Sequence, residues 1–169
     1  MKEKKMILPA ELLESPFTLI GKEWMLVAAE KDGKVNAMTA AWGGLGVLWG
    51  KNVAFVFIRP QRYTKEFVDA ADTMSLTFFG ESYRNMMNYM GKVSGRDEDK
   101  VEKAGLTVAY EGETPYFEEA RLTMIGRKLY AQELKPECFV DGDSTDKWYP
   151  EKDFHTMYVI ELEKIWMAE

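Results

Sequence analysis

The sequence contains one cysteine and one histidine among its 169 residues. A single cysteine cannot form a disulfide within the chain, and Cys138 has no companions for a zinc site. No base or cation stands beside Cys138 in the sequence, so we expect a small, semi-buried residue rather than a reactive thiol. These absences predict a protein with no bound metal and no disulfide staple.

Long apolar runs are also missing. No segment approaches the roughly 20 apolar residues that a membrane-spanning helix requires. The start of the chain, MKEKKM, is basic, but Pro9 and Glu11 interrupt the only candidate for the apolar core of a signal peptide. We therefore expect a cytoplasmic protein without membrane contact.

The chain has fewer basic than acidic residues: it contains 22 Lys and Arg against 28 Asp and Glu, and its net charge is −6. A general nucleic-acid binder needs a broad basic field, so this class is disfavoured. A single small anion site needs only a few local cations, so the net charge does not exclude such a site. The acidic segment Asp141–Asp146 lacks the length and the closing Glu of a calcium-binding EF-hand loop, and we interpret it as a solvated turn.

The length fits one domain over residues 1–169, which can bury roughly 70% of its unfolded surface without disulfides. Apolar alternation and turn residues predict strands over 17–20, 23–30, 35–42, 52–58, 74–79, 106–110, 121–133 and 154–165. Helices are expected after Thr64, Ser82 and Asp97, a tight turn at Asp32–Gly33, and a glycine-rich corner at 43–46. Regular strand–helix alternation is absent, which favours a mainly β (α+β) antiparallel barrel with helices inserted at one end.

Three segments have residue types that suit a ligand. Arg59–Thr64 follows a strong strand and opens a helix, so two guanidiniums, a hydroxyl and free backbone N–H groups could grip an anion. The alternative is a surface turn with two solvated arginines. Gly91–Asp97 is a second corner with small residues, a hydroxyl and two cations; the alternative there is a plain helix end.

The third segment is Asn36–Gly44, where small side chains leave the strand backbone accessible. A planar heterocycle could lie against this backbone and exchange hydrogen bonds with it. The aromatic content of 13% also suits a flat ligand. The alternative is a buried strand whose alanines pack beneath helices.

Taken in order, these segments resemble the flavin reductase-like family with the FMN-binding split-barrel fold, and especially its flavoredoxin-type branch. The matching motifs are Asn36–Gly44 (NAMTAAWGG), Phe57–Thr64 (FIRPQRYT), Phe78–Phe79, Val93–Asp97 (VSGRD) with Lys100, and Asp153–Tyr158 (DFHTMY). The resemblance extends from about Pro16 to Trp166.

The resemblance implies a six-stranded antiparallel Greek-key split barrel that forms homodimers, with FMN at or near the subunit interface. It implies that Thr39, Ala40 and Ala41 line the isoalloxazine and bond its polar edge, with Asn36, Met38 and Trp42 as further cofactor-binding residues of this segment. The resemblance also implies that Arg59, Arg62, Tyr63 and Thr64 hold the ribityl phosphate region, and that Ser94, Gly95 and Arg96 close the phosphate side.

The final motif departs from the family. Reductases of the wider family often show Gly-Asp-His where this chain reads Asp153-Phe154-His155, which puts the use of NADH or NADPH in question more than flavin binding. His155 either lies near the flavin or is a strand residue satisfied by a carboxylate. Trp148 and Tyr149 either cap a flavin of the partner subunit or pack at an interface.

Three functions remain open. The first is an FMN-dependent oxidoreductase that takes electrons from a reduced nicotinamide or another donor. The second is a flavoredoxin-like carrier that exchanges electrons with a protein partner and not directly with nicotinamide. The third is a barrel that binds no flavin.

Overall fold

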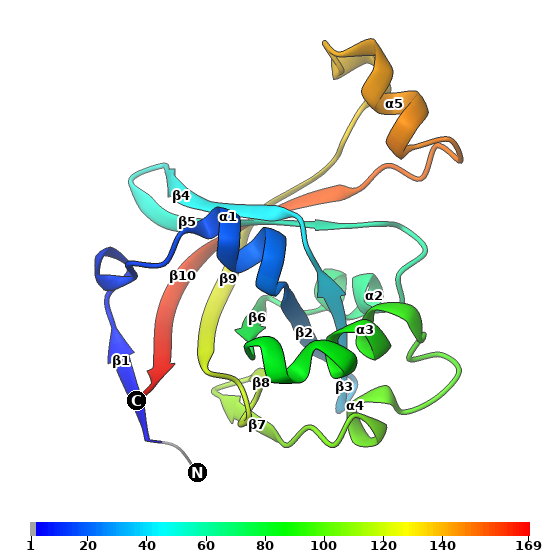
Figure 1. The fold of residues 1–169 in the computed structure, drawn as a ribbon. Coiled ribbons are helices and arrows are strands. Elements are labelled where there is room, and N and C mark those ends of the chain that lie inside the picture. Colours follow the sequence, from blue (N-terminus) through cyan, green and yellow to red (C-terminus); the bar gives the residue numbers. More distant parts are fainter. Residues whose placement is uncertain (1–2) are drawn as a thin grey trace.

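The computed structural model describes residues 3–169, so Met1 and Lys2 of the basic start lie outside the described residues. Eight strands form one antiparallel sheet in the order β3-β2-β6-β9-β10-β5-β4, with β1 paired to β10 (Figure 1). Their bounds are β1 Lys4–Ile7, β2 Met25–Lys31, β3 Lys34–Ala40, β4 Gly43–Leu48, β5 Lys51–Ile58, β6 Thr73–Phe78, β9 Leu122–Glu133 and β10 Thr156–Ala168. A separate hairpin pairs β7 (Val108–Glu111) with β8 (Thr114–Phe117).

In the described part of the chain, five α-helices interrupt the strands: α1 Pro16–Thr18, α2 Thr64–Ala70, α3 Arg84–Lys92, α4 Lys100–Lys103 and α5 Gly142–Trp148. Shorter helical turns cover Pro9–Glu11, Leu19–Glu23, Glu81–Tyr83 and Pro136–Cys138. Helices α2, α3 and α4 gather at one side of the sheet, whereas α5 projects from its far end between β9 and β10 (Figure 1). Within residues 3–169, no helix combines the length and apolar character that crossing a bilayer demands.

The sheet curls into a barrel that stays open along one seam. Strands β3 and β4 are the two ends of the sheet, yet only Ala41 and Trp42 separate them in the chain. Three Cα steps therefore bring the two edges to within about 11 Å at this link. No backbone ladder joins β3 to β4 in the described residues. The mainly antiparallel β prediction is confirmed, but the sheet has eight paired strands rather than the expected six.

Strand β2 has apolar residues on both faces because both faces are covered. Met25, Val27 and Ala29 point into the barrel core, while Leu26 and Ala28 pack in a second cluster with residues of α3 and α4. Alternate residues of a strand face opposite sides, so this continuous apolar run fixes β2 between barrel and helices. The hairpin to β3 turns at Asp32 and Gly33, both at positive φ (52° and 73°), which confirms the predicted tight turn.

Two predicted elements near the start were wrong. Residues 17–20 form helical turns rather than a strand, since Pro16 opens α1 and the following turn buries Leu19 and Ile20. The glycine-rich corner is strand β4, paired along its length with β5. Gly43 lies so close to β5 that a Cβ there would stand 2.6 Å from the Phe55 carbonyl oxygen. The small residues of β4 therefore allow it to pack closely against β5.

Local signals also misplaced some helix starts. The segment predicted as a solvated turn opens α5, where the Asp141 side chain accepts a hydrogen bond from the Asp143 amide. Helix α4 is capped by Asp99 and not by Asp97, and α3 begins at Arg84 without a side-chain cap from Ser82. Cys138, expected to be semi-buried, is exposed. At α4 a neighbouring aspartate takes the capping role, whereas α3 begins without a side-chain cap.

Candidate functional site

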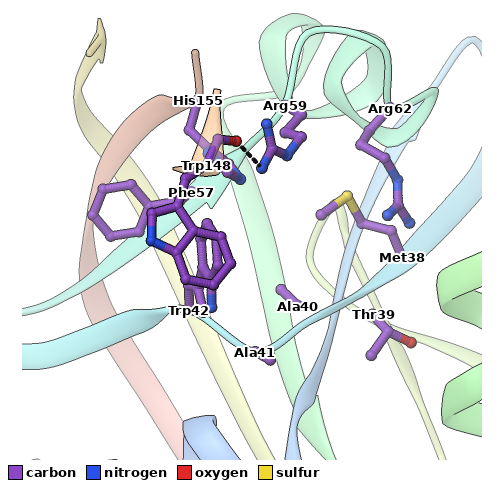
Figure 2. A pocket seen from close by; sticks show the side chains of 10 residues that line it. All are labelled: Met38, Thr39, Ala40, Ala41, Trp42, Phe57, Arg59, Arg62, Trp148 and His155. Carbon is purple, nitrogen blue, oxygen red and sulfur yellow. Dashed lines mark hydrogen bonds between the residues drawn. The ribbon is translucent and has the colours of Figure 1, made fainter. Parts of the chain in front are cut away.

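Two cavities adjoin at the open seam of the barrel. The larger, of about 310 Å³, is lined by residues of β3, the 41–42 link and three other segments: Met38, Thr39, Ala40, Ala41, Trp42, Phe57, Arg59, Arg62, Trp148 and His155 (Figure 2). The smaller, of about 150 Å³, is lined by Gln61, Arg62, Tyr63, Thr64, Gly91, Lys92, Val93, Ser94, Gly95 and Lys100. Arg62 borders both, so the two cavities meet at its side chain.

The floor of the larger cavity is an unpaired strand edge. Strand β3 pairs with β2 on one side only, so half of its backbone groups face away from the sheet. The Thr39 hydroxyl is already engaged, because Oγ1 donates a 2.5 Å hydrogen bond to the Met87 carbonyl of α3. A ligand at this edge would therefore meet backbone donors and acceptors rather than the Thr39 hydroxyl proton.

Aromatic rings form one wall of the larger cavity. Trp42 meets Trp148 edge to face at 5.1 Å between ring centroids, and Trp42 lies 5.2 Å from the His155 ring. Phe57 adds a second edge contact to His155 at 6.4 Å. Figure 2 shows Trp148 reaching over this wall from the α5 segment. Such a wall suits a flat, conjugated ligand.

His155 is a buried, neutral group in this wall. Its side chain is 7% exposed, and Nδ1 lies 2.7 Å from the Tyr149 hydroxyl. Burial, with a further contribution from the positive charge of Arg59, lowers the pKa of His155 to about 4. The partner of His155 is thus a phenol and not the carboxylate considered above. At neutral pH the imidazole cannot supply a positive charge to the cavity.

Arg59 is held by protein groups. Its Nη1 donates to Asp153 Oδ2 at 2.8 Å, and its Nη2 donates to the Trp148 carbonyl at 3.0 Å. Gln61 donates to the same Asp153 oxygen at 2.8 Å. These contacts tie the end of α5 to the end of β5. Arg59 lines the larger cavity and not the smaller one.

Arg62 and Lys100 are cations without carboxylate partners. Neither forms a salt bridge in the part of the chain that the structure describes. Burial lowers the pKa of Arg62. Burial, followed by the nearby charge of Arg62, lowers the pKa of Lys100 to about 8. Two like charges that share a partly buried cavity make that cavity attractive to an anion.

The walls of the smaller cavity are fixed by tight packing between three segments. Asn36 of β3 donates from Nδ2 to the Thr64 hydroxyl at 2.9 Å, and both residues are buried. Gly95 packs directly on this pair: a Cβ there would overlap Asn36 Oδ1 and stand 3.0 Å from the Tyr63 ring. The three segments singled out in the sequence therefore meet in one place.

A family model described as "Flavin reductase like domain" matches residues 18–169. The chain belongs to this family. Its fold is that of the FMN-binding split barrels, with flavoredoxins and flavin reductases among its structural neighbours. No curated protein gives a significant sequence match to this flavin reductase-like chain.

Three solved structures illustrate the likeness. An FMN-binding domain of flavin reductase-like enzyme from Shewanella baltica OS155 aligns with a TM-score of 0.72 at 14% identity, covering 99% of this chain and 78% of that one. Flavoredoxin of Desulfovibrio vulgaris (Miyazaki F) aligns with a TM-score of 0.69 at 21% identity, covering 98% and 77%. The flavin reductase PheA2 aligns with a TM-score of 0.60 at 15% identity, covering 87% and 80%. At these identities the likeness establishes the fold.

Within this flavin reductase-like fold, most of the predicted site residues gather around the two cavities. Asn36 and Arg96 do not line either of them. Asn36 lies behind Thr64, and Arg96 is exposed, pairs with Glu66 at 2.5 Å and covers the Tyr63 ring at 4.7 Å. Their contacts orient neighbouring residues of the cavity wall.

Apart from His155 and Trp148, six residues that line the two cavities were not among the predicted cofactor-binding residues: Phe57, Gln61, Gly91, Lys92, Val93 and Lys100. Trp148 was expected either to cap a flavin of the partner subunit or to pack at an interface, but it lines the larger cavity of its own chain. The signal for Lys100 was its place beside the VSGRD segment in the motif that resembles the family. Trp148 carried no local signal, because only the tether between Arg59 and the α5 end brings it there.

Proposed function

We propose that this flavin reductase-like domain binds FMN, with the isoalloxazine in the larger cavity and the phosphate in the smaller, and works as an FMN-dependent oxidoreductase. The single observation that supports this assignment best is the position of Arg62, which has no carboxylate partner among residues 3–169 and lies at the junction of an aromatic cavity and a basic one. A molecule with a flat ring at one end and an anion at the other matches both.

The chemistry of the residues fits this ligand. The unpaired edge of β3 and the Ala41–Trp42 link offer backbone groups for the polar edge of the ring. Arg62 supplies a charge-assisted fork for phosphate oxygens, and Thr64 and Ser94 supply hydroxyls beside it. When bound, the flavin supplies the hydride or electron chemistry, while the protein orients the ring and sets its surroundings.

The protein's own contribution near the ring is apolar and neutral. His155 is uncharged at neutral pH, and Trp42, Phe57 and Trp148 exclude water from one wall. Arg59 adds the remaining positive charge on this side, although Asp153 neutralises much of it. Stabilisation of extra negative charge on a reduced ring would therefore fall mainly to backbone N–H groups.

A second candidate is an electron carrier that does not use nicotinamide directly. The observation that favours it is Trp148, which with Trp42 forms one wall of the larger cavity. With the flavin ring in that cavity, these two indoles would compete with a nicotinamide for access to the ring. The carrier function predicts that a protein donor, and not NADH or NADPH, reduces the bound flavin.

Anaerobic reduction separates the two. Purified protein loaded with FMN is mixed with NADH or NADPH, and loss of the visible flavin absorbance is followed. Turnover with either nucleotide supports the oxidoreductase. Reduction by dithionite but by neither nucleotide supports the carrier, and failure to retain FMN at all contradicts both.

We also propose a homodimer. Helix α5 projects from the sheet in Figure 1, and its segment exposes Val140 fully and Trp148 by 44%. A second copy is the simplest cover for these apolar groups. Sedimentation of the purified protein tests this, and a concentration-independent monomer would contradict it.

A further inference from the structure

Lys100 is a buried lysine whose ammonium is held by backbone alone. Its side chain begins α4 and is 2% exposed. Nζ donates to the Met90 carbonyl at 2.9 Å and to the Val93 carbonyl at 3.0 Å. These two carbonyls belong to the C-terminal turn of α3, where a helix leaves its last oxygens without partners.

Protonation changes the number of N–H donors that the Lys100 amine offers. A neutral amine has two N–H donors and a lone pair, so the two carbonyls use both of its donors. A protonated amine has three donors. The third has no acceptor in residues 3–169, and Lys100 lines the smaller cavity. Protonation therefore adds one charged donor that protein groups leave free.

The charged groups around Lys100 favour an anion. Arg62 faces it from the segment before α2, and Lys92 lines the same cavity from the end of α3. The carboxylates of its own loop are turned elsewhere: Glu98 pairs with Lys103 and accepts from Tyr89, and Asp99 caps α4 at the Glu102 amide. Asp97 is exposed.

We propose that Lys100 donates its third N–H to the FMN phosphate, and that binding of the doubly charged phosphate is coupled to uptake of a proton by Lys100. This inference rests on the proposed function and deepens it. A phosphate monoester carries nearly two negative charges above about pH 7. The charges of Arg62 and protonated Lys100 match that number.

The coupling gives FMN binding a characteristic pH dependence. Burial and Arg62 lower the pKa of Lys100 to about 8 without ligand, and a bound dianion would raise it. Between these two values the protein takes up a proton on binding, so the dissociation constant for FMN rises by up to about tenfold per pH unit. Riboflavin lacks the phosphate and should not share this dependence.

The test compares FMN with riboflavin from about pH 7 to about pH 9.5, by flavin fluorescence titration of wild type, Lys100→Met and Lys103→Met. Lys103 lies in the same short helix, but it is exposed and pairs with Glu98. We expect FMN affinity to fall with rising pH in wild type and Lys103→Met, and to be weaker and nearly independent of pH in Lys100→Met. The same pH slope in all three proteins would overturn the inference.

A second measurement needs no variant. Calorimetry at about pH 9 in buffers of different ionisation enthalpy gives the protons taken up on binding. Wild type should take up close to one proton with FMN and almost none with riboflavin. Equal uptake for both flavins overturns the role of Lys100 while leaving FMN binding intact. If wild type binds no FMN, the proposed function fails together with this inference.

Discussion

Arg59 and Arg62 stand one turn apart and line the same cavity, but only Arg59 is neutralised: Asp153 Oδ2 accepts from it at 2.8 Å, whereas Arg62 has no carboxylate partner in the described chain. Two arginines in one motif thus have different surroundings. Arg59 fastens the α5 segment, and Arg62 is free to meet an anion.

Removal of Arg62 should weaken the binding of FMN more than the binding of riboflavin. Arg62→Ala deletes a charge-assisted contact to phosphate, which corresponds to a loss of about 10- to 100-fold in FMN affinity. Riboflavin affinity should change by much less. Arg127→Ala is a matched control, because Arg127 pairs with Glu161 and Glu163 on β10 and borders neither cavity. Equal losses for both flavins in Arg62→Ala would count against a phosphate contact.

A bulky residue at Ala41 should block the ring without unfolding the barrel. Ala41 lies in the link across the seam, lines the larger cavity and is partly exposed. Ala41→Trp would fill that cavity, whereas Ala41→Ser preserves its volume. We expect flavin binding to be lost in the first and retained in the second, with unchanged thermal unfolding. A flavin spectrum shared by Ala41→Trp and wild type would show that the ring lies elsewhere.

Gly95→Ala should disturb both stability and the smaller cavity. The added Cβ overlaps Asn36 Oδ1, and Asn36 is fixed by its hydrogen bond to Thr64. Forced displacement in a tight cluster costs about 1–3 kcal/mol of unfolding free energy. At Gly142 an added Cβ meets nothing within 4 Å, so Gly142→Ala is the control. Chemical denaturation measures both, and equal stabilities would contradict the packing described.

Stability should fall in mild acid because of His155. The unfolded chain protonates this histidine below about pH 6.5, but in the folded chain burial lowers the pKa of His155 to about 4. Between these values the unfolded state binds more protons, so the free energy of unfolding decreases as the pH falls, by about 3 kcal/mol in all. His155→Gln removes this contribution. Parallel pH curves for wild type and variant would show that the histidine is not buried as a neutral group.

Much of the barrel could be predicted from local sequence. The run NVAFVFI has the β-branched and aromatic residues of a buried strand, and it is β5. The Asp32–Gly33 hairpin follows from turn chemistry. Strand β4 could not be predicted in this way: its glycines have no strand preference, and only the pairing with Phe55 and its neighbours on β5 makes it extended.

The candidate site, too, could be predicted from the sequence only in part. The motif order placed Arg62, Thr64 and Ser94 in one region, and the structure brings them to one cavity. That Arg59 has a carboxylate partner and Arg62 has none among the described residues could not be predicted, because Asp153 is 94 residues distant from Arg59 in sequence. Long-range partners decide which of two equivalent cations remains available.

The most direct test of the two-cavity account is a fluorescence titration of the wild-type protein with FMN and with riboflavin under the same conditions. We expect one flavin per chain, with FMN bound at least about tenfold more tightly than riboflavin, since only FMN can engage Arg62 and its neighbours in the smaller cavity. Equal affinity for the two flavins, or no binding of either, would contradict it.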